Sequence, residues 1–343
     1  MPHFERMIVV ASIALAGTAA FAAPGSAQGV AEFYKGKTIA ILMGTNPGGS
    51  YDLYGRVIGE HLSRYIPGNP SIIMEHMPGA GGVTAGNHVF GPGPQDGTKI
   101  LLSHSIPLAE KLEPRGVRFE STRFQWLGTF DAIAHTMAIW HDSQVNSLDA
   151  LKTRPLVIGS FSKTHLTYQW PAMMKHVLGT NYQVITGYRS GSDLNLAMER
   201  GEVHGWAASW ENLAGTRPQW LADKKVSVLV SFTLERKKKI PDVPTLLELA
   251  PPDKKDVVEL LAAGTPFGRA MAVGPGVPAD RVAALRKAFD AVMKDPAFLA
   301  EAAKRHLDID PRPAAYPHAL ADKLAAASPE LLARVKQAIG QSE

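Results

Sequence analysis

The sequence predicts an α/β protein with two doubly wound lobes that are joined by a hinge. Two consecutive units, each a strand, a glycine-rich turn and a helix, indicate the first lobe: the strands are at 38–43 and 71–74, and the helices at 53–65 and 83–90. The same pattern starts again after residue 105, which indicates a second lobe. A β-branched run at 225–232 could return the chain to the first lobe, and two crossings can serve as a hinge.

The first residues, 1–27, are predicted to be a secretory signal peptide. Arg6 precedes a short apolar run at 7–20, and small residues follow, so that cleavage is expected after Ala22 or Ala27. An uncleaved anchor is the alternative, although no cysteine follows the run to accept a lipid. We therefore expect an exported, periplasmic protein.

The composition limits the classes of function. With 343 residues and no cysteine, the chain must depend on buried cores, and its length favours two lobes. Acids and bases are interspersed, and the basic run at 236–239 is interpreted as a solvated loop, because no aromatic platform or nucleic-acid motif accompanies it. We expect a monomer with no nucleic-acid partner, no cofactor and no metal.

The two glycine turns of the first lobe are predicted to bind an anion. Such turns aim backbone N–H groups and the positive end of a helix dipole at one point, and turns on neighbouring parallel strands face the same cleft. A turn that merely needs glycine is the alternative. Asp52 is interpreted as a helix-capping residue, because a bare carboxylate would repel an anion. The candidate ligand contacts are Gly48, Gly49, Ser50, Ala80, Gly81 and Gly82, with Ser103 and Ser105 after the third strand.

In the second lobe, the candidates follow the strands predicted at 155–160 and 183–186. Lys163 could pair with a second ligand carboxylate or lie on the surface, and Arg189 is a further candidate charge partner. Ser192 or Asp193 is expected to cap the next helix. Phe130 and Trp206 could line the cleft or belong to the core. The candidate contacts here are Phe130, Ser160, Ser162, Lys163, Thr164, Tyr188 and Ser190.

Ordered blocks along the chain resemble the solute-binding proteins of tripartite tricarboxylate transporters, the TctC or Bug-type family. The blocks are 47–52 followed by Arg56, then 78–82, 96–98, 187–188 with 201–203, and 240–245 with Glu248. The resemblance implies a periplasmic binding protein of the Venus-flytrap type. Such a receptor closes on a small organic acid, a mono- or dicarboxylate, and delivers it to membrane permease subunits without catalysis.

The resemblance also implies how the ligand is held. In similar proteins, two glycine loops and ordered waters hold a carboxylate, and the second lobe discriminates among acids. Segments 159–165 and 185–189 depart from the common pattern, so the grip on the anion carries over more safely than the identity of the ligand. We expect lobe 1 to comprise 28–105 and 231–343, with a terminal helix at 319–339, and lobe 2 to comprise 106–230.

Other functions find less support. The nucleophile motif Gly-x-Ser-x-Gly and the zinc motif His-Glu-x-x-His are absent, and the tripeptide at 36–38 lacks the earlier glycine of a phosphate loop. A secreted α/β enzyme is therefore the weaker alternative. A chemosensory receptor that uses the same clamp to inform a signalling partner is the stronger one. Aromatic acids, amino acids and citrate-like acids all have a carboxylate that the backbone N–H groups of the two glycine turns could bind.

Overall fold

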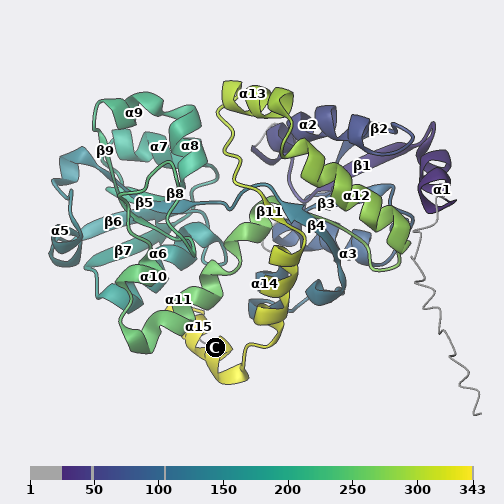
Figure 1. The fold of residues 1–343 in the computed structure, drawn as a ribbon. Coiled ribbons are helices and arrows are strands. Elements are labelled where there is room, and N and C mark those ends of the chain that lie inside the picture. Colours follow the sequence, from purple (N-terminus) through teal and green to yellow (C-terminus); the bar gives the residue numbers. More distant parts are fainter. Residues whose placement is uncertain (1–24, 48–49, 104–105, 342–343) are drawn as a thin grey trace, which may run out of the picture.

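The described chain forms two mixed sheets, each with helices on both of its faces (Figure 1). The computed structural model describes residues 25–47, 50–103 and 106–341. Nearly all of the predicted signal peptide, 1–27, lies outside these ranges. Within them, no helix is both long enough and apolar enough to cross a bilayer. The pair of sheets confirms the predicted class, an α/β protein with two lobes.

The first sheet has six strands. In spatial order they are β11 (Arg312–Pro313), β4 (Gln125–Thr129), β10 (Ala270–Val273), β3 (Lys99–Leu102), β1 (Thr38–Met43) and β2 (Ser71–His76). Strand β1 pairs in parallel with both β2 and β3, which confirms the two βαβ units expected from the sequence. Strands β10 and β11 run antiparallel to their neighbours, so the sheet is mixed.

The second sheet has five strands. In spatial order they are β7 (Tyr182–Thr186), β6 (Leu156–Ser160), β8 (Gly205–Ser209), β5 (His135–Trp140) and β9 (Val226–Ser231). Strand β6 is parallel to β7 and β8, whereas β5 is antiparallel to β8 and β9. Because β9 pairs with β5, the β-branched run completes the second sheet, and the chain returns to the first sheet only after it.

The helices divide between the two sheets. Those beside the first sheet are α1 (Gly25–Tyr34), α2 (Ser50–Leu62), α3 (Val83–Phe90), α4 (Ile106–Leu112), α12 (Ala279–Val292), α13 (Pro296–Lys304) and α14 (Ala315–Ala325). Those beside the second are α5 (Leu148–Thr153), α6 (Leu166–Leu178), α7 (Gly191–Glu199), α8 (Trp210–Thr216), α9 (Pro218–Ala222), α10 (Leu246–Leu249), α11 (Lys255–Ala262) and α15 (Pro329–Ala338) (Figure 1).

Strand alternation distributes the apolar side chains between separate cores. In β1, Ile39 and Ile41 pack with α2 and α12 on one face of the sheet, whereas Leu42 packs with α3 and α4 on the other. This second core continues beneath the other sheet, where the rings of Trp170 and Phe232 stack with centroids 4.9 Å apart. One continuous core therefore joins the two sheets.

The pairing of the strands corrects the predicted lobe ranges. Strand β4 lies within 106–230, the range expected for lobe 2, but it pairs with β10 in the first sheet. The first crossing is therefore 130–134. Helices α11 and α15 lie within 231–343, the range expected for lobe 1, but they pack against each other, and α15 packs on α6 beside the second sheet. Sequence order alone cannot reveal these returns.

The predicted terminal helix at 319–339 is in fact two helices. Helix α14 ends at Ala325, and α15 begins at Pro329. Ser328 caps α15 by accepting a hydrogen bond from Leu331 N at 3.2 Å. Proline is favoured at the first position of a helix and disfavoured in its interior, which explains the break.

Candidate functional site

The two glycine turns of the first lobe lie against each other beyond the carboxyl ends of β1 and β2. A Cβ atom built on Gly44 would lie 2.4 Å from the Cα atom of Gly82, so only glycine at position 44 allows this approach. Thr45 of the first turn and both Ala80 and Gly81 of the second line one cavity. The described parts of the two turns therefore face the same space.

The second turn has an unusual backbone. Gly79, Ala80, Gly81 and Gly82 have φ angles of 145°, 45°, 61° and 97°, all in the region that favours glycine. A Cβ atom built on Gly81 would meet no atom within 4 Å, so this position is open to the cavity. The turn leads into α3, whose first residue, Val83, also lines the cavity. The positive end of the α3 dipole therefore points towards this space.

A chain of hydrogen bonds supports the first turn from behind. The His76 ring, at the end of β2, places Nδ1 2.9 Å from Thr45 O and Nε2 3.1 Å from an Asp52 carboxylate oxygen. Asp52 also accepts from Arg56 Nε at 3.1 Å. Asp52 is buried in the first turn of α2, where a carboxylate also stabilises the helix end. Its position is that of a supporting residue.

The opposite wall of the cavity comes from the second lobe, at the turn between β6 and α6. Ser162 and Thr164 line the cavity from this turn, and their hydroxyl oxygens are 3.3 Å apart. His165 caps α6 by accepting from Thr167 N at 3.1 Å, and it also lines the cavity. The amino termini of α3 and α6 thus reach the cavity from opposite lobes, and both favour negative charge there.

One buried guanidinium forms part of the cavity wall. Arg269 directly precedes β10, is 2% exposed, and has its guanidinium carbon 4.4 Å and 4.3 Å from the ring centroids of Tyr51 and Tyr54. Burial raises the pKa of Tyr51 to about 12, although the charge of Arg269 opposes this shift. The two neutral rings hold the guanidinium in a fixed position.

A neutral histidine lies in the same wall. His135, the first residue of β5, is 8% exposed. Burial, with contributions from His165 and Arg269, lowers the pKa of His135 to about 3, so the ring is uncharged near neutral pH. Its Nδ1 has no hydrogen-bond partner among the described residues.

The cavity as a whole has the size of a small-molecule site. Its volume is about 810 Å³, within the range of about 300–1,000 Å³ that is usual for ligand pockets. Besides the polar groups, aliphatic side chains line it: Val83, Leu108, Leu112, Ile133 and Leu166.

The structure brings only some of the predicted contacts to this cavity. Ala80, Gly81, Ser162 and Thr164 line it. Gly82 and Ser103 are buried next to the turns, and Ser103 N donates to Ala270 O at 2.8 Å. Gly48, Gly49, the side chain of Ser50, and Ser105 lie outside the described residues.

Other predicted contacts lie elsewhere. Phe130 is not a wall of the cavity but a core aromatic, 1% exposed and stacked on Tyr54 with centroids 5.4 Å apart. Ser160 is buried, and its hydroxyl donates to Ile185 O at 3.0 Å. Lys163 is exposed and does not belong to the cavity lining. Trp206 is buried in the core on the far face of the second sheet.

The turn that follows β7 does not reach the cavity. Strand β7 is at the edge of its sheet, and none of the residues 187–193 that follow it lines the cavity. Tyr188 packs on the core beside α7. Ser190, not Ser192 or Asp193, caps α7: its hydroxyl oxygen accepts from Asp193 N at 3.2 Å. Arg189 N donates to the Asp193 carboxylate at 3.3 Å.

Sequence reasoning missed several residues of the cavity. Tyr51 had a signal, because it lies within the first glycine turn and its helix. Arg269, His135 and Gln169 have no such local signal: they lie far apart in the sequence, and only the arrangement of the strands brings them together.

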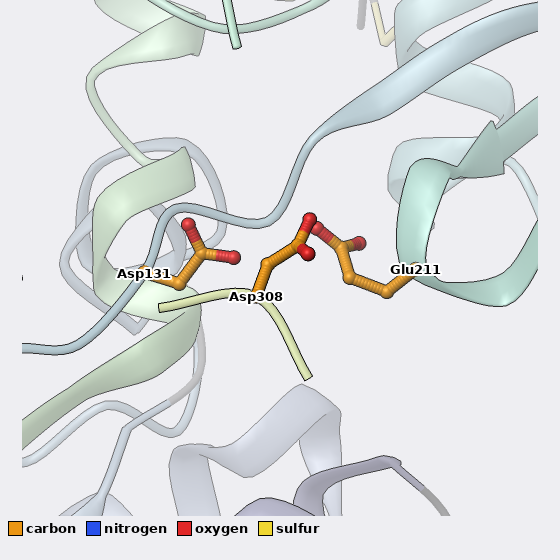
Figure 2. A group of neighbouring side chains, drawn as sticks. All are labelled: Asp131, Glu211 and Asp308. Atoms are coloured by element: carbon orange, nitrogen blue, oxygen red, sulfur yellow. The ribbon is translucent and has the colours of Figure 1, made fainter. Parts of the chain in front are cut away.

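A second polar cluster lies where the chain passes between the sheets. Asp131, Glu211 and Asp308 come from three separate segments and point their carboxylates towards one another, with one oxygen of each within 4.8 Å of the others (Figure 2). Such a group could hold a cation, and here that cation is the ammonium of Lys237. We name these four residues the Lys237 cluster.

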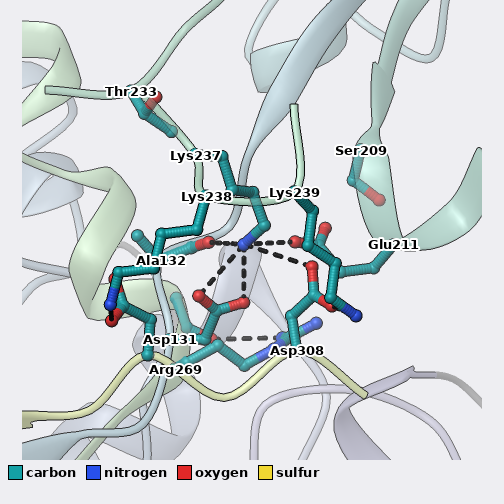
Figure 3. Close-up of polar contacts among 12 residues, drawn as sticks. Asp131, Ala132, Ser209, Glu211, Thr233, Lys237, Lys238, Lys239, Arg269 and Asp308 are labelled. Atoms are coloured by element: carbon teal, nitrogen blue, oxygen red, sulfur yellow. Dashed lines mark hydrogen bonds and ion pairs between the residues drawn. The ribbon is translucent and has the colours of Figure 1, made fainter. Parts of the chain in front are cut away.

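Lys237 contacts all three carboxylates (Figure 3). Its Nζ is 2.9 Å from Asp131, 3.2 Å from Glu211 and 3.5 Å from Asp308. Burial opposes the charge of Lys237, but the carboxylates prevail and raise its pKa. Burial also raises the pKa of Asp131 to about 7, against the lowering effect of Lys237. The three carboxylates thus carry more negative charge than one buried ammonium can neutralise.

The two sheets, the cavity and the crossings define a two-lobed α/β protein. Two curated proteins are similar to it in sequence. The chain is 28% identical to protein BugT of Bordetella pertussis over 268 residues, 73% of this chain and 76% of the relative. It is 25% identical over 260 residues to a UPF0065 protein from the gbd 5' region of Cupriavidus necator, with 71% and 74% covered. No family model matches the chain.

Solved structures share the fold. A TctC solute-binding protein from Polaromonas superposes with a TM-score of 0.66 at 16% identity, covering 90% of this chain and 100% of that one. The periplasmic binding protein BugD gives 0.63 at 20%, covering 89% and 98%. A malate-bound MatC and an adipate-bound protein, both of Rhodopseudomonas palustris, give 0.60 and 0.62 at 20% and 16%, covering 88% and 89% of this chain and 99% and 97% of theirs.

These relatives confirm the resemblance seen in the sequence: the chain is similar to proteins of the TctC and Bug type and shares their fold. The solved structures that share the fold are named as binding proteins, which agrees with the expectation of a receptor. Their periplasmic class agrees with the predicted location.

Proposed function

We propose that the protein closes on a small organic carboxylate in the periplasm and delivers it to a tripartite tricarboxylate-type permease. One observation carries the proposal: the cavity of about 810 Å³ has the positive ends of α3 and α6 on opposite walls, beside a glycine turn that is open to it. A carboxylate bound there gains from both helix dipoles. The malate-bound and adipate-bound neighbours share this fold.

The ligand carboxylate is proposed to lie against the first-lobe turns, at Thr45, Ala80 and Gly81. Ser162 and Thr164 approach it from the second lobe when the lobes close. The moving parts are proposed to be the first sheet with its helices and the second sheet with its helices, and the crossing at 130–134 acts as part of the hinge. Because α1 begins at Gly25, cleavage after Ala22 would leave this helix complete.

A panel of organic acids tests the proposal on the mature protein by thermal shift and titration calorimetry. An acid present at 100 times its dissociation constant should add about 2.7 kcal/mol to the free energy of unfolding. If no acid of a broad panel, including aliphatic, aromatic, hydroxy and amino acids, shifts the melting temperature or gives heat, the proposal is wrong.

A chemosensory receptor is the second candidate, because the same clamp could inform a signalling partner. Deletion of the neighbouring permease genes would separate the two. Loss of growth on the bound acid supports transport, whereas retained growth with loss of the response to the acid supports sensing.

A further inference from the structure

We infer that the cleft selects an acid with a single carboxylate and an extended apolar body over a compact acid with two or three carboxylates. The inference rests on the proposed function, which places one carboxylate at the glycine turns. It concerns the rest of the ligand, whose surroundings are set by the remaining walls of the cavity.

Aliphatic side chains from both lobes line the cavity. Leu108 and Leu112 are four residues apart on α4 and therefore lie on one face of that helix. Ile133 comes from the crossing, and Leu166 begins α6; both are only half-buried, so a ligand can cover them. Leu108 and Leu112 are themselves buried, so Ile133 and Leu166 supply the partly exposed aliphatic surface, which favours an apolar ligand body.

The polar groups of the second-lobe wall carry no charge. Ser162, Thr164, Gln169 and Ser209 are neutral, and burial keeps His135 neutral by lowering its pKa to about 3. These groups can hydrogen-bond a carbonyl or hydroxyl of the ligand. None of them offers the opposite charge that a second buried carboxylate requires.

The buried cation of the wall, Arg269, already faces excess negative charge. Figure 3 shows it beside the Lys237 cluster, where three carboxylates meet one buried ammonium. Lys239 also pairs with Asp308, at 2.6 Å, but its side chain is 58% exposed, so water screens much of its charge. Burial raises the pKa of Asp131 most, and the nearby carboxylates of Glu211 and Asp308 raise it further. A ligand carboxylate next to Arg269 would add one more negative charge.

The remaining charges of the described lining are at the rim. Glu113 and Arg115 are both exposed and have opposite signs. Charges in water at these positions contribute little to affinity. One carboxylate is thus held by the turns and helix ends. The buried cation that the described lining offers to a second carboxylate is Arg269, and it already faces the carboxylates of the Lys237 cluster.

Calorimetry with matched acids tests the inference on the mature protein. Along straight-chain monocarboxylates from propionate to octanoate, affinity should rise about fourfold for each added CH₂ group, which corresponds to about 0.8 kcal/mol. Hexanoate should bind at least tenfold more tightly than adipate, and benzoate more tightly than terephthalate. An affinity that stays flat with chain length, or tighter binding of the diacids, overturns the inference but leaves the proposed function intact. If no acid binds at all, both are wrong.

A pair of variants locates the contact. Leu166→Asn should lower the affinity for octanoate at least fivefold and that for propionate much less. Leu196→Asn, on α7 and 41% exposed outside the cavity, is the matched control and should change neither. If Leu166→Asn remains folded and binds octanoate as the native protein does, the apolar wall does not hold the ligand.

Discussion

Removal of the ammonium from the Lys237 cluster should destabilise the protein in a way that acid repairs. Lys237→Met keeps the aliphatic stem and leaves Asp131, Glu211 and Asp308 within 4.8 Å of one another. Because the pKa of Asp131 is already raised to about 7, its protonation at neutral pH costs little. Glu211 and Asp308 then lose the ammonium that offsets their charges, and removing one partner of a buried ion pair costs about 3–5 kcal/mol. We expect a loss of about 3–4 kcal/mol at pH 7.

Urea unfolding at pH 7 and pH 5 measures this effect. The deficit of Lys237→Met relative to the native protein should shrink at pH 5, because the crowded carboxylates take up protons in the folded state. Millimolar Ca²⁺ should stabilise the variant and not the native protein, since oxygen ligands in reach of one another are what Ca²⁺ prefers. Lys238→Met is the matched control: its side chain is 81% exposed, and its loss should produce a change near zero. An equal deficit at both pH values would refute the reasoning.

The remaining predictions concern the cleft and its supports. Gly81→Val should abolish carboxylate binding, whereas Gly201→Val, which has a similar positive φ and open surroundings outside the cavity, should cost only stability; equal binding by both would contradict the role of the turn. His135 has a folded-state pKa of about 3, below its usual 6.5, so the unfolded state binds its proton first and stability falls as the pH drops below 6.5. Between pH 7.5 and 5.0, the free energy of unfolding of the native protein should therefore fall by about 2 kcal/mol relative to that of His135→Gln, as urea unfolding measures. Parallel pH profiles of the two proteins would argue against this. Thr245→Val should cost about 1 kcal/mol in the same assay, because it breaks the capping box with Glu248.

The sequence alone predicts the local strand, turn and helix units of the first lobe. The strand at 38–43 was predicted with its observed bounds, because it is a short apolar run between a lysine and a glycine turn. The errors came from long-range pairing. Nothing local in β4 indicates that it pairs with β10, which lies about 140 residues later in the sequence, so the lobe boundary was placed too early.

The site was predictable to the same degree. Turns after neighbouring parallel strands were expected to meet, and the contact between Gly44 and Gly82 shows that they do. Predicting the second-lobe contacts requires knowing that β6 is inside its sheet and β7 at its edge. The amino-acid sequence of neither strand reveals this order. Arg269 is the clearest case: its role depends on two tyrosines more than 200 residues earlier in the sequence. The block 240–245 with Glu248, which contributed to the resemblance, contains the capping box of α10.

The cleft and the crossings share residues, and we expect them to respond together. Phe130 N donates to Arg269 O at 3.2 Å, and Phe130 O accepts from Asp310 N at 3.0 Å, so the first crossing is tied to both neighbouring segments. Lys237, from the segment after β9, holds Asp131 of the same crossing. Since Arg269 also lines the cavity, a rotation of the lobes about this point changes the shape of the cavity wall. Lys237→Met should therefore alter ligand affinity as well as stability, whereas Thr245→Val should lower stability and leave affinity unchanged.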